Sequence, residues 1–334
     1  MNAADQRLPA GSALNPDTAH KARMALPPLA RVVLWMIGTL LSFSVMAVSI
    51  RELSAALSIM EILSARAAIG LLMVGALLAI RPALRHAINR RRLGLHALRN
   101  SIHFGSQYLW ATSLLLLPLS TVFALEFTMP AWTMLLATLM LGERMTPSRI
   151  GAVVLGLFGV FVILRPGIET FHPAALLVLA AALGYSVQNI ATKQLTTTES
   201  TFAIVFWMNV IQLPLGLLGA DPWFVARLGL HELPALAGLG LAGLSAHYCL
   251  SNAFRAGDAS LVVPLDFLRI PLIAVVGWWL YGEPLDVFVF AGAGLIILGL
   301  LWNLRREAQP ALAARSPAPQ IRPEPAAAEE AGSS

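Results

Sequence analysis

Seven ionisable residues lie within long apolar stretches of the sequence: Glu126, Asp266, Arg269, Arg66, Glu61, His103 and His247. Ionisable groups at membrane depth are costly to bury, so each one is a candidate for a functional site. Asp266 and Arg269 are three residues apart, which places both on one face of a helix. They form a structural ion pair, or else Arg269 binds a carboxylate or phosphate while Asp266 or Glu126 exchanges a proton.

A second cation, Arg66, lies near the middle of the apolar stretch 57–80. Its acidic neighbour Glu61 is five residues away, about 140° round a helix, which makes a direct pair unfavourable. We therefore expect a partner on another helix, such as Glu126. The sequence leaves open whether Arg66 serves a structural pair or contacts a ligand.

Polar side chains with apolar bodies suggest the wall of a binding cavity for an organic molecule. Tyr108, Tyr248 and His247 are of this kind, and Gln188 adds polarity to another apolar stretch. Hydrogen bonding between helices is the alternative role for these residues. Trp110 and Trp132 are interpreted as packed or lipid-facing, outside the site.

The second half of the chain is a diverged copy of the first. With a shift of 140 residues and no gap, residues 105–159 align on 245–299 with nine identities in 55 positions. Glu126 then falls on Asp266, Tyr108 on Tyr248, and Glu143 on Glu283. Internal repeats in an apolar chain are typical of membrane transporters.

Composition places these candidates in a membrane. The chain of 334 residues is 57% hydrophobic and 12% charged, whereas soluble domains carry about 25% charged residues. A spanning helix needs about 20 mostly apolar residues. Ten segments qualify: 32–50, 57–80, 98–117, 119–141, 149–165, 173–192, 202–219, 233–254, 259–281 and 286–303.

The distribution of basic residues orients these spans. If the chain starts inside and changes side at each span, eighteen basic residues lie inside and three outside, Arg51, Arg165 and Arg227. This bias predicts that both termini are cytoplasmic. Because five is an odd number, the second set of five spans enters from the opposite side. The sequence thus predicts an all-α membrane protein with ten transmembrane helices in two inverted five-helix repeats.

Prolines and glycines mark local features of the spans. Pro130 and Pro271 lie inside spans and should kink them, but they miss repeat correspondence by one residue, so the kinks need not be symmetric. Glu143 and Glu283 follow glycines at span ends. A carboxylate there suits the start of the next helix, so we interpret both as turn and capping residues, with a gate as the alternative.

The ten spans, the repeat and the two Pro…Gly-Glu stretches at 130–143 and 271–283 resemble the drug/metabolite transporter superfamily, specifically its EamA-type members. The resemblance covers residues 32–303. It implies ten helices around a central cavity in a bacterial cytoplasmic membrane. Relatives move amino acids, riboflavin, S-adenosylmethionine or toxic cations. The family's own pattern marks Glu143 and Glu283, while the central polar residues are inferred from this sequence alone.

The expected organisation is a disordered cytoplasmic tail at each end and two repeats between them: 1–30, 31–167, 168–304 and 305–334. No catalytic motif, P-loop or cysteine metal site is present in the sequence, so no enzyme activity, cofactor or metal is expected. A secondary transporter of a small polar or amphipathic metabolite is the main hypothesis. A membrane-embedded transferase and a non-transporting scaffold or sensor are the alternatives.

The expected partners are a small-molecule substrate and the lipid bilayer, and the basic residues do not indicate nucleic acid, because they gather on one side of the spans. A coupling proton or counter-substrate and a homodimer are further partners that the sequence allows. It identifies neither the substrate nor the direction of movement.

Overall fold

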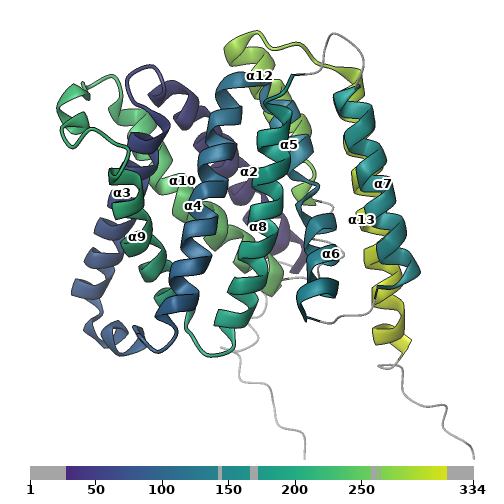
Figure 1. The fold of residues 1–334 in the computed structure, drawn as a ribbon, viewed down its shortest axis with the longest axis horizontal. Helices are drawn as coiled ribbons and strands as arrows, with labels where there is room; N and C mark the ends of the chain where they lie inside the picture. The colour runs from purple at the N-terminus through teal and green to yellow at the C-terminus, as the bar shows by residue number, and fades with distance from the viewer. Residues whose placement is uncertain (1–27, 142–144, 166–171, 257–261, 263–264, 314–334) are drawn as a thin grey trace, which may run out of the picture.

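The computed structural model describes residues 28–141, 145–165, 172–256, 262 and 265–313, and all regular structure in these residues is helical (Figure 1). The α-helices are α2 (Pro28–Leu53), α3 (Ile59–Ile80), α4 (Leu93–Leu116), α5 (Leu119–Glu126), α6 (Met129–Leu141), α7 (Pro147–Leu164), α8 (Ala175–Thr196), α9 (Thr201–Leu217), α10 (Leu233–Ala256), α12 (Arg269–Tyr281) and α13 (Val287–Ala313). Two short 3₁₀ helices, η1 (Pro82–Ala87) and η2 (Phe224–Arg227), lie in connections. The expected all-α class is confirmed for the described residues.

Seven segments of the described chain are long and apolar enough to cross a membrane. They correspond to α2, α3, α5 with α6, α7, α8, α10 and α13. The shorter helices α9 and α12 are also apolar. Helix α4 has sufficient length, but its buried polar side chains, among them Arg99, Asn100 and His103, lower its hydropathy.

The helices pack in pairs that respect the internal repeat. The closest pairs are α2 with α10, α4 with α8, α3 with α9, and α7 with α13. The repeat relates α2 to α8, α3 to α9, α4 to α10 and α7 to α13. It therefore converts the pair α2–α10 into the pair α8–α4, and it leaves the pairs α3–α9 and α7–α13 unchanged. In Figure 1, α3 and α9 lie at one side of the bundle and α7 and α13 at the other.

Glycines allow α7 and α13 to approach closely. A Cβ added at Gly159 would lie 2.5 Å from the carbonyl oxygen of Gly292, and one added at Gly292 would lie 2.5 Å from that of Gly159. Small residues at helix interfaces permit such backbone contact in membrane proteins. This pair of helices therefore forms one unit beside the other helices.

Two apolar stretches are interrupted at repeat-related positions. Helix α5 ends at Glu126 and α6 begins at Met129, while α12 begins after a turn at Phe267 and Leu268. The expected span over 119–141 agrees with the segment Leu119–Met140, which is long and apolar enough to cross a membrane but contains this break. The prolines at 130 and 271 are offset by one residue in the repeat, but both act in the same way. A proline has no N–H to donate to the carbonyl four residues earlier, and this loss favours a break in the helix.

The two breaks meet each other. The rings of Phe127 and Phe267, which are repeat equivalents, have centroids 4.9 Å apart. Both phenylalanines are buried. The contact brings the ends of the two half-helices together, including the residues on either side of each break.

The three basic residues assigned to the outside all pair with carboxylates at one end of the bundle. Arg51 pairs with Glu283, Arg227 with Glu61, and Arg165 Nη2 lies 2.5 Å from Asp286 Oδ2. We call this the ion-paired end. The opposite end carries the start of α2 and the end of α13 (Figure 1).

Candidate functional site

Arg269 lies between the two repeat-related acids. Its Nη2 is 2.6 Å from Asp266 Oδ1 and 2.7 Å from Oδ2, and its Nη1 is 3.6 Å from Glu126 Oε1. Only 5% of the Arg269 surface is exposed. The structure thus brings these three residues together, with the half-helix ends at both breaks holding the two acids.

Aromatic side chains complete this cluster. Trp110 is packed, which is one of the two roles expected for it, and its Nε1 donates to Glu126 Oε2 at 2.8 Å. The Arg269 guanidinium lies 3.9 Å from the ring centroid of Phe43 and 5.2 Å from that of Phe127. Cation–π contacts and a charge-assisted hydrogen bond both stabilise ionised groups away from water.

A cavity of about 480 Å³ opens beside the two breaks, between α6, α8, α10, α12 and α13. Glu126, Asp266 and Arg269 line it together with Asn189 and Asn303. The remaining lining residues are Phe127, Met129, Pro130, Thr133, Met134, Leu250, Val262, Phe267, Leu300 and Leu304. The wall is thus apolar with a few convergent polar groups, as in small-molecule sites.

The cavity continues toward the opposite end of the bundle. A second hollow of about 360 Å³ shares Thr133, Met134 and Asn189 with the first. It also reaches Arg149, near the start of α7, and Lys193, in the last turn of α8. These two residues lie at the end of the bundle away from the paired arginines.

The sequence suggested Glu126 as a partner for Arg66, but the two residues do not pair in the structure. Its Nη2 donates to Gln107 Oε1 at 2.7 Å and to Gln212 Oε1 at 2.6 Å. Gln212 Nε2 lies 2.9 Å from His103 Nδ1. Arg66 is therefore held by amides of α4 and α9, a contact that depends on helix packing and that its position within α3 could not reveal.

Gln188 contacts another buried arginine. With its amide oxygen turned toward α4, Gln188 accepts from Arg99 Nη2 at 2.8 Å and from Thr192 Oγ1 at 2.7 Å. Arg99 Nη1 also donates to Asn100 Oδ1 at 2.6 Å. Arg99 is one of the eighteen basic residues that the predicted topology assigns to the inner side of the spans. In the structure it is buried in the second turn of α4.

The three ring side chains expected in the wall of the binding cavity lie outside the 480 Å³ cavity. His247 is exposed, and its ring centroid lies 5.9 Å from that of Phe43. Tyr248 is exposed and contacts Trp35 edge to face at 5.8 Å, and Tyr108 is also exposed. The 480 Å³ cavity is not lined by His247, Tyr108 or Tyr248, although His247 reaches Phe43, which contacts Arg269.

Glu283 joins three elements at the ion-paired end. One carboxylate oxygen contacts Arg51, and the other accepts from the backbone N–H of Leu119 at 2.8 Å. Arg51 Nη2 also donates to the carbonyls of Leu114 at 2.5 Å and Leu117 at 2.8 Å. Glu283 thus caps a helix, as expected, but it caps α5, which is distant in the sequence.

Glu61, a further apolar-stretch acid, has a local role. It forms a capping box with Ser58 at the start of α3, accepts from Asp221 N at 3.3 Å and pairs with Arg227. It therefore fastens η2 to the ion-paired end rather than entering the central cluster. Glu143 lies outside the described residues.

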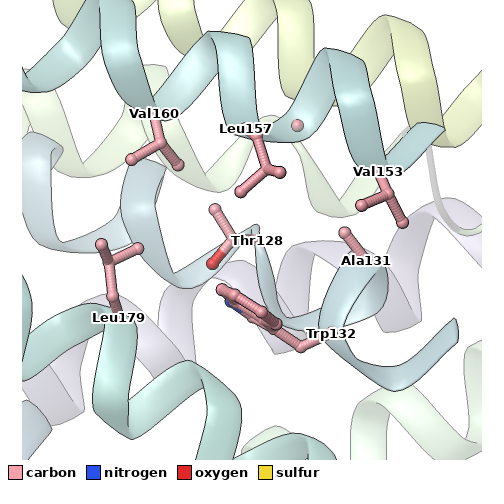
Figure 2. Close-up of a pocket in the computed structure, with 8 residues that line it drawn as sticks. Thr128, Ala131, Trp132, Val153, Leu157, Val160 and Leu179 are labelled. Carbon is pink, nitrogen blue, oxygen red and sulfur yellow. The ribbon is translucent and has the colours of Figure 1, made fainter. Parts of the chain in front are cut away.

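A smaller apolar cavity of about 40 Å³ lies between α6, α7 and α8. Figure 2 shows the Trp132 ring beside Thr128, with Val153, Leu157 and Val160 of α7 facing them. Trp132 is packed here, and its buried Nε1 has no hydrogen-bond partner among the described residues. The described residues also contain no group of three metal-binding side chains.

Comparison with known proteins gives a consistent picture. A model of the EamA-like transporter family matches residues 30–165 and again 172–305, which agrees with a two-repeat architecture. The riboflavin transporter of Rhizobium johnstonii is 34% identical over 239 residues, covering 66% of this chain and 78% of its own.

Two further relatives carry other names. The S-adenosylmethionine uptake transporter of Rickettsia felis is 26% identical, with 67% of this chain and 76% of its own covered. The pseudopaline exporter of Pseudomonas aeruginosa is 27% identical, with 83% and 97% covered. A solved crystal structure is 18% identical, with a TM-score of 0.55 over 84% of this chain and 97% of that one, which is a likeness of fold alone.

Proposed function

Because the chain belongs to the EamA-like transporter family, we propose that it is a secondary transporter of a small polar or amphipathic metabolite. An amino acid, a vitamin or a nucleoside-like compound is the expected class. The relatives named as transporters of riboflavin and S-adenosylmethionine support a metabolite of this size. They act as transporters rather than enzymes, and the same holds for this chain.

The observation that carries the proposal is the cavity at the two helix breaks. Its volume of about 480 Å³ lies within the range of about 300–1,000 Å³ typical of small-molecule sites. Glu126 comes from one repeat, and Asp266 and Arg269 from the other. Discontinuous helices that meet at the membrane midplane hold substrates and coupling ions in many transporters.

The mechanism that we propose is alternating access in the bacterial cytoplasmic membrane. Ten spans in two inverted sets, with both termini in the cytoplasm, place the ion-paired end outside. The Arg51–Glu283 pair and the cap on α5 close that end, while the cavity extends toward Arg149 and Lys193 at the cytoplasmic end. The structure then represents an inward-facing state, and breaking the Arg51–Glu283 contact would accompany outward opening.

The test begins with metabolite profiles of cells with and without the gene, which identify the solute. Counterflow of that solute into liposomes containing the purified protein then measures transport. We expect Glu126→Gln and Asp266→Asn each to reduce flux at least about tenfold while folded protein remains in the membrane.

Glu232→Gln is the matched control, because the Glu232 carboxylate accepts from Gly229 N in a connection outside the cavity. It should transport like the wild type. Normal flux in both cavity variants would reject the central acids as transport residues. No flux of any solute in the wild-type protein would favour the scaffold or sensor hypothesis.

A further inference from the structure

Three arginines in the described part of the chain are buried: Arg66, Arg99 and Arg269. Arg269 pairs with a carboxylate, as do the partly buried Arg51 and Arg165. Arg66 and Arg99 are 8% and 6% exposed, and the described residues give them no carboxylate partner. A buried cation without an opposite charge is costly in a membrane protein, so a neutral hydrogen-bond shell alone does not balance it.

The partners of both arginines are neutral. Arg66 donates to the amide oxygens of Gln107 and Gln212. Arg99 donates to Asn100 and Thr192, and Gln188 accepts from it. The Nε of Arg66 is buried and has no hydrogen-bond partner among the described residues. That donor remains available for a ligand acceptor.

The two arginines share a neighbourhood with two histidines. Arg99 and His103 are four residues apart on α4, and Gln107 follows after another four, so the three lie on one face. Gln212 links Arg66 to His103, since its Oε1 accepts from Arg66 Nη2 at 2.6 Å and its Nε2 lies 2.9 Å from His103 Nδ1. A Cβ added at Gly243 of α10 would lie 3.8 Å from Arg66 Cδ, and His247 follows four residues later on the same face of α10. We call Arg66, Arg99, His103 and His247 the basic cluster.

His247 shows that this cluster borders an accessible space. Its side chain is exposed, and its ring centroid lies 5.9 Å from that of Phe43 on α2. The Phe43 ring in turn lies 3.9 Å from the Arg269 guanidinium. The basic cluster therefore meets the same interior as Phe43 and Arg269.

We propose that the basic cluster binds an anionic group of the transported metabolite, a carboxylate or a phosphate, with Arg66 and Arg99 as its counter-charges. This inference rests on the transport function proposed above and adds a substrate class to it. The anion supplies the opposite charge that the protein lacks at this place. The empty protein then carries an electrostatic cost that substrate binding relieves.

The first test needs no ligand. Thermal unfolding of the purified full-length protein in detergent compares Arg66→Gln, Arg99→Gln and Arg269→Gln. An uncompensated cation can be neutralised without loss, so the first two variants should melt no lower than the wild type. Arg269→Gln, which strands Asp266 and Glu126, should melt several degrees lower. Equal destabilisation of all three would show that Arg66 and Arg99 are structural and would overturn the inference.

The second test uses matched ligand pairs that differ in one anionic group. Riboflavin is compared with riboflavin 5′-phosphate, and decarboxylated S-adenosylmethionine with S-adenosylmethionine, by the shift in melting temperature as each is titrated. We expect at least one pair in which the wild-type protein binds the anionic member about tenfold tighter, because hydrogen bonds to charged groups contribute about 1.5–3 kcal/mol. The Arg66→Gln/Arg99→Gln variant should lose this preference, and Arg66→Lys should retain part of it.

Equal binding within each pair, or a preference that survives in the double variant, would contradict the anion site. Neither outcome affects the transport proposal, which depends on the flux measurements with Glu126 and Asp266 variants. Absence of flux in the wild-type protein, with the ligand preference intact, would instead reject transport and leave the binding site in place.

Discussion

Arg269 is shared unequally by two acids, lying 2.6 Å from Asp266 Oδ1 and 3.6 Å from Glu126 Oε1. Asp266 lies three residues before it, on the other side of the break at Phe267 and Leu268, whereas Glu126 ends a half-helix of the other repeat. The weaker contact is the one between repeats. Movement of one repeat relative to the other would therefore change the Glu126 contact first.

This arrangement predicts the behaviour of charge variants. Arg269→Gln leaves two partly buried carboxylates without their cation, and because breaking a fully buried pair costs about 3–5 kcal/mol, the variant should be clearly less stable than the wild type. Asp266→Asn/Arg269→Gln should recover much of that loss, because only Glu126 then remains charged, yet it should not transport. Yield and melting temperature in detergent, followed by counterflow, measure the two effects. Recovery of transport together with stability would show that Arg269 is purely structural.

The indole of Trp110 should matter beyond its size. Trp110→Phe keeps an aromatic ring against Phe123 but removes the N–H donor to Glu126. Loss of one hydrogen bond to a buried charged group should cost about 1–3 kcal/mol and reduce counterflow. Trp223→Phe is a suitable control, because Trp223 is 79% exposed. The same flux and melting temperature in both variants would remove Trp110 from the site.

The ion-paired end should control access to the cavity. In a Cys249→Ser background, Asn189→Cys provides a single thiol on the cavity wall. A membrane-impermeant maleimide should label it from the cytoplasmic side, and addition of Glu283→Gln should raise labelling from outside. The Arg51–Glu283 pair joins α2 to the α12–α13 connection, so its loss frees that closure.

Arg165→Gln is the comparison for this experiment, since it breaks an ion pair at the same end between α7 and Asp286. Its effect on outside labelling should be small, because α7 and α13 stay packed through their glycines. Equal labelling from outside in the Asn189→Cys protein, with Glu283→Gln added and with Arg165→Gln added, would mean that Glu283 is only a helix cap.

The glycine contact between α7 and α13 gives a stability prediction. Gly159→Ala and Gly292→Ala should each cost about 1–3 kcal/mol by overpacking, because the new methyl meets backbone that cannot rotate away. Gly294→Ala, on the same helix as Gly292, has open space around its Cβ and should be neutral or slightly stabilising. Melting temperatures in detergent provide the comparison. A Gly294 variant as unstable as the other two would contradict the backbone contact as the cause, because alanine favours the helix at every one of these positions.

Topology remains a prediction that reporter fusions can settle. A reporter after residue 334 should be cytoplasmic and one inserted near residue 168 external, because each repeat holds an odd number of spans. Activity on the same side at both places would contradict the inverted repeat.

Much of the fold and part of the site could be predicted from the sequence, and the reason lies in what a repeat encodes. The shift of 140 residues aligns Glu126 with Asp266. Because the two repeats are related by a two-fold axis, equivalent residues at equal depth are expected around the same central cavity, and this expectation requires no knowledge of side-chain packing. Arg66 was different, since its amide partners come from α4 and α9. Only the arrangement of helices decides which of many polar side chains it reaches.

Trp110 and the helix breaks were missed for local reasons. Its spacing of seven from His103 places Trp110 on the polar face of α4, and this periodicity was a usable signal. The breaks were harder to predict, because hydropathy is continuous across 119–141 and a proline alone can kink a helix without ending it. Phe127 and Phe267 are equivalent in the repeat, but this equivalence indicates the breaks only after the structure has shown a turn at both residues.

The contact between the tilted rings of Phe127 and Phe267 also bears on the ancestry of the molecule. If two identical five-helix chains had formed the same bundle, this contact would join a residue to its own copy across a two-fold axis, and every substitution would act twice. Fusion into one gene removes that constraint. Arg269 has Met129 as its repeat counterpart, so one cation serves two acids here. A symmetric dimer would have had two such arginines or none.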